Sequence, residues 1–204
     1  MRNLYAMRDL FDRSPPDVSS RAQAVEPSNA AWVALALVLA LPWLNPFSPG
    51  PSSSAVPMQF SWFCAALVLL ALTLRVRAME GIDLVRLLAL SWSLAALLSA
   101  VIGLIQYGGA SAQFGVWINP VGPGEAFGNL RQRNQFSTLM AIGLASLLWW
   151  ARRVPTRGGL IAGVLVAALL GAGSAASSSR TGMMEMLLLA ALVLIWLRGR
   201  ERAA

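Results

Sequence analysis

The stretch LLALSWSLAALLSAVIGLIQY, residues 87–107, decides the fold class of this chain. It runs for 21 residues without a charged side chain. A helix of about 20 apolar residues is long enough to cross the roughly 30 Å hydrocarbon core of a bilayer. A lone strand there would leave backbone amides without hydrogen-bond partners. The stretch therefore predicts a transmembrane helix.

Five further apolar blocks lie on either side of this stretch. They cover residues 30–44, 57–74, 136–151, 158–176 and 183–197. Hydrophobic residues make up 57% of the 204 residues and charged residues only 12%, a balance that no single soluble core requires. We therefore predict an all-α, polytopic transmembrane helix bundle of about six spans, with residues 30–197 as the membrane domain.

The arginines predict the orientation of this bundle. All 16 basic residues are arginines, and thirteen of them lie before the first block, in alternate connections or after the last block. Basic residues close to a span resist translocation and collect on the cytoplasmic side. Both termini are therefore predicted to be cytoplasmic, as tails of residues 1–29 and 198–204, in a multi-pass protein of the bacterial inner membrane.

Three arginines break this rule and mark a candidate binding site. Arg131 and Arg133 lie in GNLRQRNQF, residues 128–136, and Arg180 lies in SSSRTG, residues 177–182; each segment directly precedes an apolar block. If helices begin there, unpaired N–H groups and the positive helix ends lie beside the guanidinium groups. Such a cluster favours an anion such as phosphate. The alternative is that the arginines extend to lipid phosphates while the hydroxyls cap a helix.

Other chemistry finds little support in the sequence. The connection of residues 108–135 is the longest and is predicted to be periplasmic. Glu185 is the one acid well inside an apolar block. It is either a functional carboxylate, a partner of Arg131 or Arg133 in an ion pair, or a carboxyl protonated near the interface. There is no histidine, and no metal-ligand cluster or nucleophile motif is evident. We therefore predict no cofactor and no metal, and the catalytic residue stays unknown. Nucleic-acid binding is not expected, because the arginines do not cluster with aromatic residues.

A stripe of small residues marks the block of residues 158–176. A glycine or alanine occupies every fourth position from Gly159 to Ala175. Such a stripe forms a groove that lets another helix approach closely. The second helix would belong to the same chain or to a dimer partner.

The segment FGNLRQRNQF, residues 127–136, followed by an apolar span, resembles the signature of bacterial protein glycosylation ligases. These are the O-oligosaccharyltransferases of the O-antigen ligase and polymerase superfamily. The later SSRTG, residues 178–182, is similar to a second pattern of that superfamily. The resemblance implies transfer of a glycan from undecaprenyl-pyrophosphate-linked oligosaccharide to a protein, or to lipopolysaccharide, on the periplasmic face. The implied partners are this lipid-linked glycan, the acceptor and membrane lipid.

The same resemblance implies roles for the motif residues. Arg131, Arg133 and Arg180 would bind the pyrophosphate and stabilise it as a leaving group, with supporting hydrogen bonds from Asn129, Gln132, Asn134 and Gln135. Family members have more spans and a later periplasmic loop with a catalytic histidine, so the resemblance covers only the amino-terminal part of the family. We therefore expect a truncated or split glycosyltransferase that a second chain could complete. The alternatives are a non-catalytic membrane module that binds lipid-linked glycan or a partner, and an O-antigen polymerase-like protein.

Overall fold

The computed structural model describes residues 29–45, 47, 55–74, 83–130, 132–151, 153 and 156–203. The predicted amino-terminal tail, except for its last residue, and Arg131 lie outside these ranges. Within them the chain forms six α-helices, two 3-10 helices and no strand. The prediction of an all-helical protein is confirmed for this part of the chain.

Each predicted apolar block coincides with one α-helix. The α-helices are α2 (Asn29–Ala40), α3 (Val56–Leu74), α4 (Leu84–Tyr107), α5 (Arg133–Ala151), α6 (Arg157–Ala176) and α7 (Arg180–Ala203); the 3-10 helices are η2 (Leu41–Trp43) and η3 (Ser111–Trp117). Several boundaries differ from the sequence prediction: α2 ends at Ala40 and is followed by η2, and α4 and α7 each begin three residues before their apolar blocks. Helix α5 likewise begins three residues before its block, and α7 continues to Ala203, through most of the segment that we expected to be a tail.

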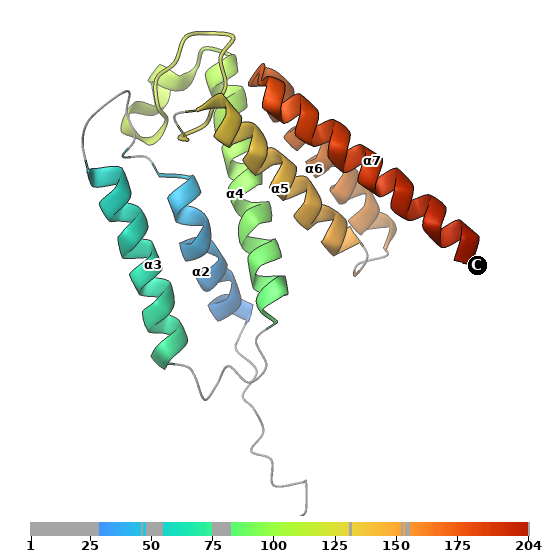
Figure 1. Ribbon diagram of the computed structural model, residues 1–204. Helices are drawn as coiled ribbons and strands as arrows, with labels where there is room; N and C mark the ends of the chain where they lie inside the picture. The colour runs from blue at the N-terminus through green and yellow to red at the C-terminus, as the bar shows by residue number, and fades with distance from the viewer. Residues whose placement is uncertain are drawn as a thin grey trace, which may run out of the picture.

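Successive helices run in opposite directions (Figure 1). Helices α2, α4 and α6 run toward one end of the bundle, and α3, α5 and α7 run back from it. We call the end that carries η3 and the first turns of α5 and α7 the site end. This alternation places the predicted anion-binding segments at the same end, with α4 and α5 in the middle of the bundle.

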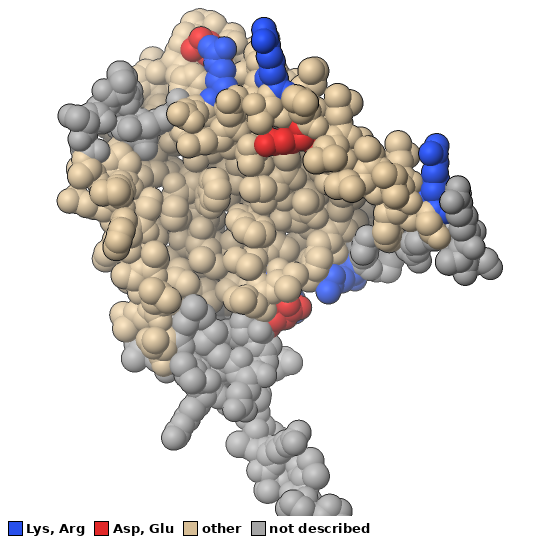
Figure 2. All heavy atoms as spheres, in the orientation of Figure 1, with Lys and Arg blue, Asp and Glu red and all other residues tan. Residues whose placement is uncertain are grey.

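Two of the described helices are long and apolar enough to cross a membrane, as judged by length and composition alone. They are α4 and α6, and shorter apolar stretches lie at Trp32–Trp43 and Val56–Ala71. In Figure 2 the charged side chains lie mainly toward the helix ends, with a broad uncharged surface between them. These features are consistent with a membrane protein.

The core lies where α4, α5 and α6 pack together. Phe136, Leu139 and Met140 of α5 are fully buried there. The backbones approach closely through small residues, because a Cβ added at Gly143 of α5 would overlap the Cβ of Ala96 of α4. The Phe136 ring packs the first turns of α5 against α4. The segment of residues 127–135 that leads into Phe136 is therefore joined directly to the packed core.

Two glycines of the small-residue stripe on α6 make no close contact with another helix. Gly163 and Gly171 have open space where a Cβ would lie. The close contact with α4 and α5 is made instead by Gly173, where a Cβ would lie 3.3 Å from both the Ala100 Cβ and the Met140 sulfur. One interpretation of the stripe was close packing against another helix of the same chain. That packing does not occur at these two glycines.

Candidate functional site

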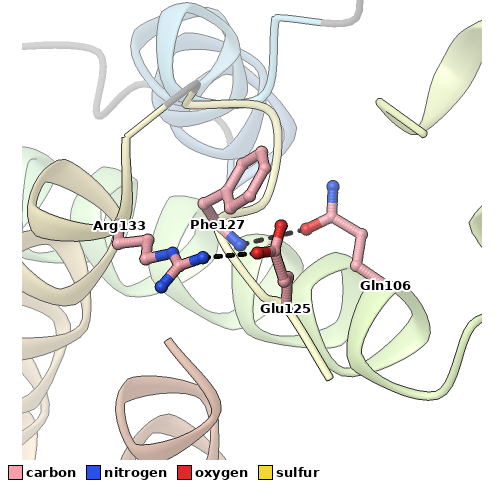
Figure 3. A network of polar contacts seen from close by, with 4 residues as sticks. All are labelled: Gln106, Glu125, Phe127 and Arg133. Atoms are coloured by element: carbon pink, nitrogen blue, oxygen red, sulfur yellow. Dashed lines mark hydrogen bonds and ion pairs between the residues drawn. The ribbon is translucent and has the colours of Figure 1, made fainter. Parts of the chain in front are cut away.

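The connection between α4 and α5 is fixed by Gln106, which lies at the end of α4 and is fully buried. Its Nε2 donates to the carbonyl oxygens of Asn119, at 3.0 Å, and Gly128, at 2.8 Å. Its Oε1 accepts from the backbone N–H of Phe127 at 3.1 Å (Figure 3). One side chain thus holds two separate parts of the connection. Sequence reasoning missed this role, although a glutamine at the end of an apolar block was a signal.

Asn129 ties the motif to two other elements. Its Nδ2 donates to the carbonyl oxygens of Leu44, at 3.1 Å, and Trp117, at 2.9 Å. Its Oδ1 accepts from the backbone N–H of Asn119 at 3.1 Å. Because an amide has two hydrogens to donate, both are used inside the protein. The structure therefore gives Asn129 a positioning role.

The turn just before Asn129 requires glycine. Gly128 has a φ of 57°, which residues with a Cβ rarely adopt. A Cβ there would also lie 3.2 Å from the Phe136 ring. The motif thus turns tightly over the anchored first turns of α5 before Arg133 begins that helix.

Arg133 forms an ion pair that the sequence did not predict. Its guanidinium donates to Oε1 of Glu125 at 2.5 Å (Figure 3). Both side chains are nearly half exposed, at 47% for Arg133 and 42% for Glu125. The pair therefore lies at the surface of the site end, and a carboxylate already occupies part of the predicted cation cluster.

Glu185 does not pair with an arginine among the described residues. Its Oε1 accepts instead from the hydroxyl of Thr138 on α5, at 2.7 Å, and its Oε2 is buried without a partner in the described structure. An ion pair with Arg133, one of the alternatives for this acid, is therefore not formed. The contact joins α7 to α5 below their first turns.

A hydrogen bond brings the two arginine-bearing segments together. The Ser179 hydroxyl donates to Oδ1 of Asn134 at 2.9 Å and accepts from the backbone N–H of Gly182 at 3.1 Å, which caps α7. A Cβ at Gly182 would overlap the Ser137 side chain, so α7 begins directly against α5. Arg133 and Arg180, predicted to act together, consequently lie at the first turns of neighbouring helices.

Two of the grooves at this end are lined by residues that the sequence predicted for the anion site. The arginine groove, about 550 Å³, lies between α6 and α7, and Ser178, Ser179 and Arg180 form its polar end. The amide groove, about 500 Å³, lies between η2 and α5 and is lined by Pro42, Trp43, Leu130, Asn134, Gln135 and Thr138. Gln132 is exposed and lines neither groove. The hydrogen bond between Ser179 and Asn134 joins one lining residue of the arginine groove to one of the amide groove.

The arginine groove carries a cation that is available for a ligand. Arg180 is exposed, and it forms no ion pair or hydrogen bond through its guanidinium with any described residue. No three His, Cys, Asp or Glu side chains in the described ranges are placed to hold a metal ion. The arrangement is therefore suited to binding an anion by guanidinium groups and hydroxyls.

Comparison with known proteins connects this region to one family. Residues 126–151 match the model of a family described as protein glycosylation ligase. The matched segment contains the Gly128 turn, Asn129, Arg133 and all of α5. No curated protein and no solved structure matches the chain. The matched segment, which begins in the loop of the candidate site, indicates a relationship to protein glycosylation ligases.

Proposed function

We propose that the chain is a multi-pass protein of the bacterial inner membrane whose site end faces the periplasm. There it binds the pyrophosphate of an undecaprenyl-linked glycan and takes part in transferring that glycan to a protein or lipopolysaccharide acceptor. The observation that carries the proposal is the hydrogen bond between Ser179 and Asn134, which sets Arg133 and Arg180 at adjoining helix starts. One of these starts lies in the segment that matches protein glycosylation ligases.

The electrostatics of this end favour a doubly phosphorylated group. The first turns of α5 and α7 expose backbone N–H groups and positive dipole ends. A guanidinium adds charge-assisted hydrogen bonds to phosphate oxygens. Arg131, two residues before Arg133 in the sequence, would add a third cation. Such a cluster would also stabilise the charge that develops on a pyrophosphate leaving group.

The proposed transfer forms a bond between the acceptor oxygen and the anomeric carbon and breaks the bond from that carbon to pyrophosphate. The acceptor proton must pass to a base. Of the two described carboxylates of this region, Glu125 is paired with Arg133, and Glu185 is bonded to Thr138 through Oε1 while its Oε2 is buried. The proposal therefore assigns binding and leaving-group stabilisation to this chain's described residues, and not the base.

Binding of undecaprenyl pyrophosphate by the purified protein tests the proposal. Arg133→Ala and Arg180→Ala should each raise the Kd about tenfold or more, since a hydrogen bond to a charged group is worth about 1.5–3 kcal/mol. The matched control is Arg198→Ala, which removes an exposed arginine near the other end of α7. Unchanged affinity in both site variants would contradict the proposal.

Cysteine labelling tests the orientation. The only cysteine, Cys64, is buried. Labelling of an introduced cysteine can therefore be measured without a signal from Cys64. Gln132→Cys and Ser178→Cys should react with an impermeant maleimide in cells with a permeabilised outer membrane. Ala151→Cys, at the opposite end of α5, should react only after lysis. The reverse pattern would rule out a periplasmic site end.

A binding module without catalysis is the second candidate. It is favoured by the engagement of both Glu125 and Glu185 in contacts within the protein. Purified protein incubated with labelled lipid-linked glycan and an acceptor distinguishes the two. Retention of intact donor supports the module, whereas glycosylated acceptor that disappears in Arg133→Ala supports the transferase.

A further inference from the structure

The amide groove differs in chemistry from the arginine groove beside it. None of its lining residues is charged: Pro42 and Trp43 come from η2, Leu130 from the motif, and Asn134, Gln135 and Thr138 from α5. Asn134 lines this groove while its Oδ1 is bonded to Ser179, which lines the arginine groove. A ligand whose phosphate is held by the arginines could therefore place an adjoining uncharged group here.

Polar groups at the edge of the groove are open for a ligand. The Gln135 side chain is exposed and makes no hydrogen bond to a described residue, and the same holds for Nδ2 of Asn134. An amide offers both donors and an acceptor, as the hydroxyl groups of a sugar do. Thr138 donates to Glu185, so its oxygen keeps the capacity to accept. The groove thus provides hydrogen bonding without charge.

The other lining residues of the amide groove are apolar. Trp43 contributes an aromatic ring, and Pro42 and Leu130 add aliphatic surface. A pyranose ring has this same division, with C–H groups on its faces and hydroxyls on its rim. A volume of about 500 Å³ also lies in the range of small-molecule sites. A smaller groove of about 270 Å³ shares Pro42, Leu130 and Gln135 and continues toward the start of α3.

We infer that the amide groove holds a neutral sugar ring of the donor glycan, next to the pyrophosphate. The inference rests on the proposed function and adds the class of sugar. A lipid chain fits less well, because it would cover Gln135 and Asn134 without pairing their amides, which is costly. An acidic sugar fits less well too, because its carboxylate would find no cation among the lining residues.

Binding of three lipids with the same undecaprenyl pyrophosphate tests this inference. One is bare, one carries a single N-acetylglucosamine and one a single glucuronic acid. The unmodified protein should bind the neutral glycolipid about tenfold more tightly than the bare lipid, as expected for one or two hydrogen bonds of about 1 kcal/mol each. Gln135→Ala and Trp43→Leu should each reduce this preference to about twofold or less.

The control variant is Gln113→Ala, which removes an exposed glutamine on η3 that lines neither groove. It should keep the full preference. Binding of the bare lipid by Gln135→Ala and Trp43→Leu shows that they are folded and that their arginine site is intact.

Three results would overturn the inference. They are an unchanged preference in both groove variants, an equal loss of affinity for the bare and the neutral lipid, and binding of the glucuronic acid lipid as tightly as the neutral one. If the bare lipid binds through Arg133 and the sugar adds nothing, this inference fails while the proposed function stands. If the protein binds none of the lipids, both fail.

Discussion

Ser179 donates its hydroxyl hydrogen to the amide oxygen of Asn134 across 45 positions of sequence, at 2.9 Å. Asn134 directly follows Arg133, and Ser179 directly precedes Arg180. This bond therefore joins the two arginine-bearing helix starts, together with the close approach of Gly182 to Ser137. It also joins a lining residue of the arginine groove to one of the amide groove, so it links both proposed parts of the donor site.

Replacing Ser179 by alanine should weaken this arrangement. The change removes the bond to Asn134 and the cap on the Gly182 N–H, and loss of a helix cap costs about 0.5–2 kcal/mol. We expect a lower midpoint of thermal unfolding in detergent and weaker binding of undecaprenyl pyrophosphate. For the unfolding measurement Ser178→Ala is the control, because the Ser178 side chain makes no hydrogen bond to a described residue. Equal stability of the two variants would show that the bond contributes nothing.

Replacing Gln106 by leucine should release the connection between α4 and α5. The change leaves three backbone groups without their partner, and each unsatisfied buried group costs about 1–3 kcal/mol. We expect faster hydrogen exchange at residues 119–129, measured by mass spectrometry. Gln113→Leu, an exposed position on η3, should exchange as the unmodified protein does. Unaltered exchange in Gln106→Leu would mean that other contacts hold the connection.

Replacing Glu125 by glutamine should strengthen anion binding. Glu125 holds the Arg133 guanidinium that we propose for pyrophosphate, so its removal frees that cation. An exposed ion pair is worth about 0.2–1 kcal/mol, which corresponds to at most about a fivefold lower Kd for undecaprenyl pyrophosphate. Glu185→Gln removes an acid that does not contact Arg133 and serves as the control. A raised Kd in Glu125→Gln would indicate instead that the carboxylate orients Arg133 for the ligand.

A pair of glycine substitutions tests the packing of the bundle. Gly143→Ala places a Cβ into the Cβ of Ala96, and such overpacking costs about 1–3 kcal/mol. Gly163→Ala makes the same change where nothing lies within 4 Å. It should be neutral or stabilise the protein by up to about 1 kcal/mol, because alanine favours a helix. Thermal unfolding of both variants in one detergent provides the comparison.

The sequence by itself determined the helices and their order. The apolar blocks are long and local, so hydrophobicity alone located the starts of α2 to α7 to within three residues. It also placed Arg133 and Arg180 just before apolar blocks, and the structure shows that α5 and α7 begin at these two residues. Local composition carries this information, since a helix makes its backbone hydrogen bonds within its own segment.

Only the tertiary structure decided which polar groups meet. The partners of Gln106, Asn129 and Arg133 lie in the connection between α4 and α5 or beyond it, where no periodicity indicates a pairing. The motif residues Asn134 and Gln135 lie in the groove of η2, while Arg180 lies in another. Such contacts depend on how helices far apart in sequence pack, and that packing is fixed by close approaches such as Gly143 against Ala96, which composition does not reveal.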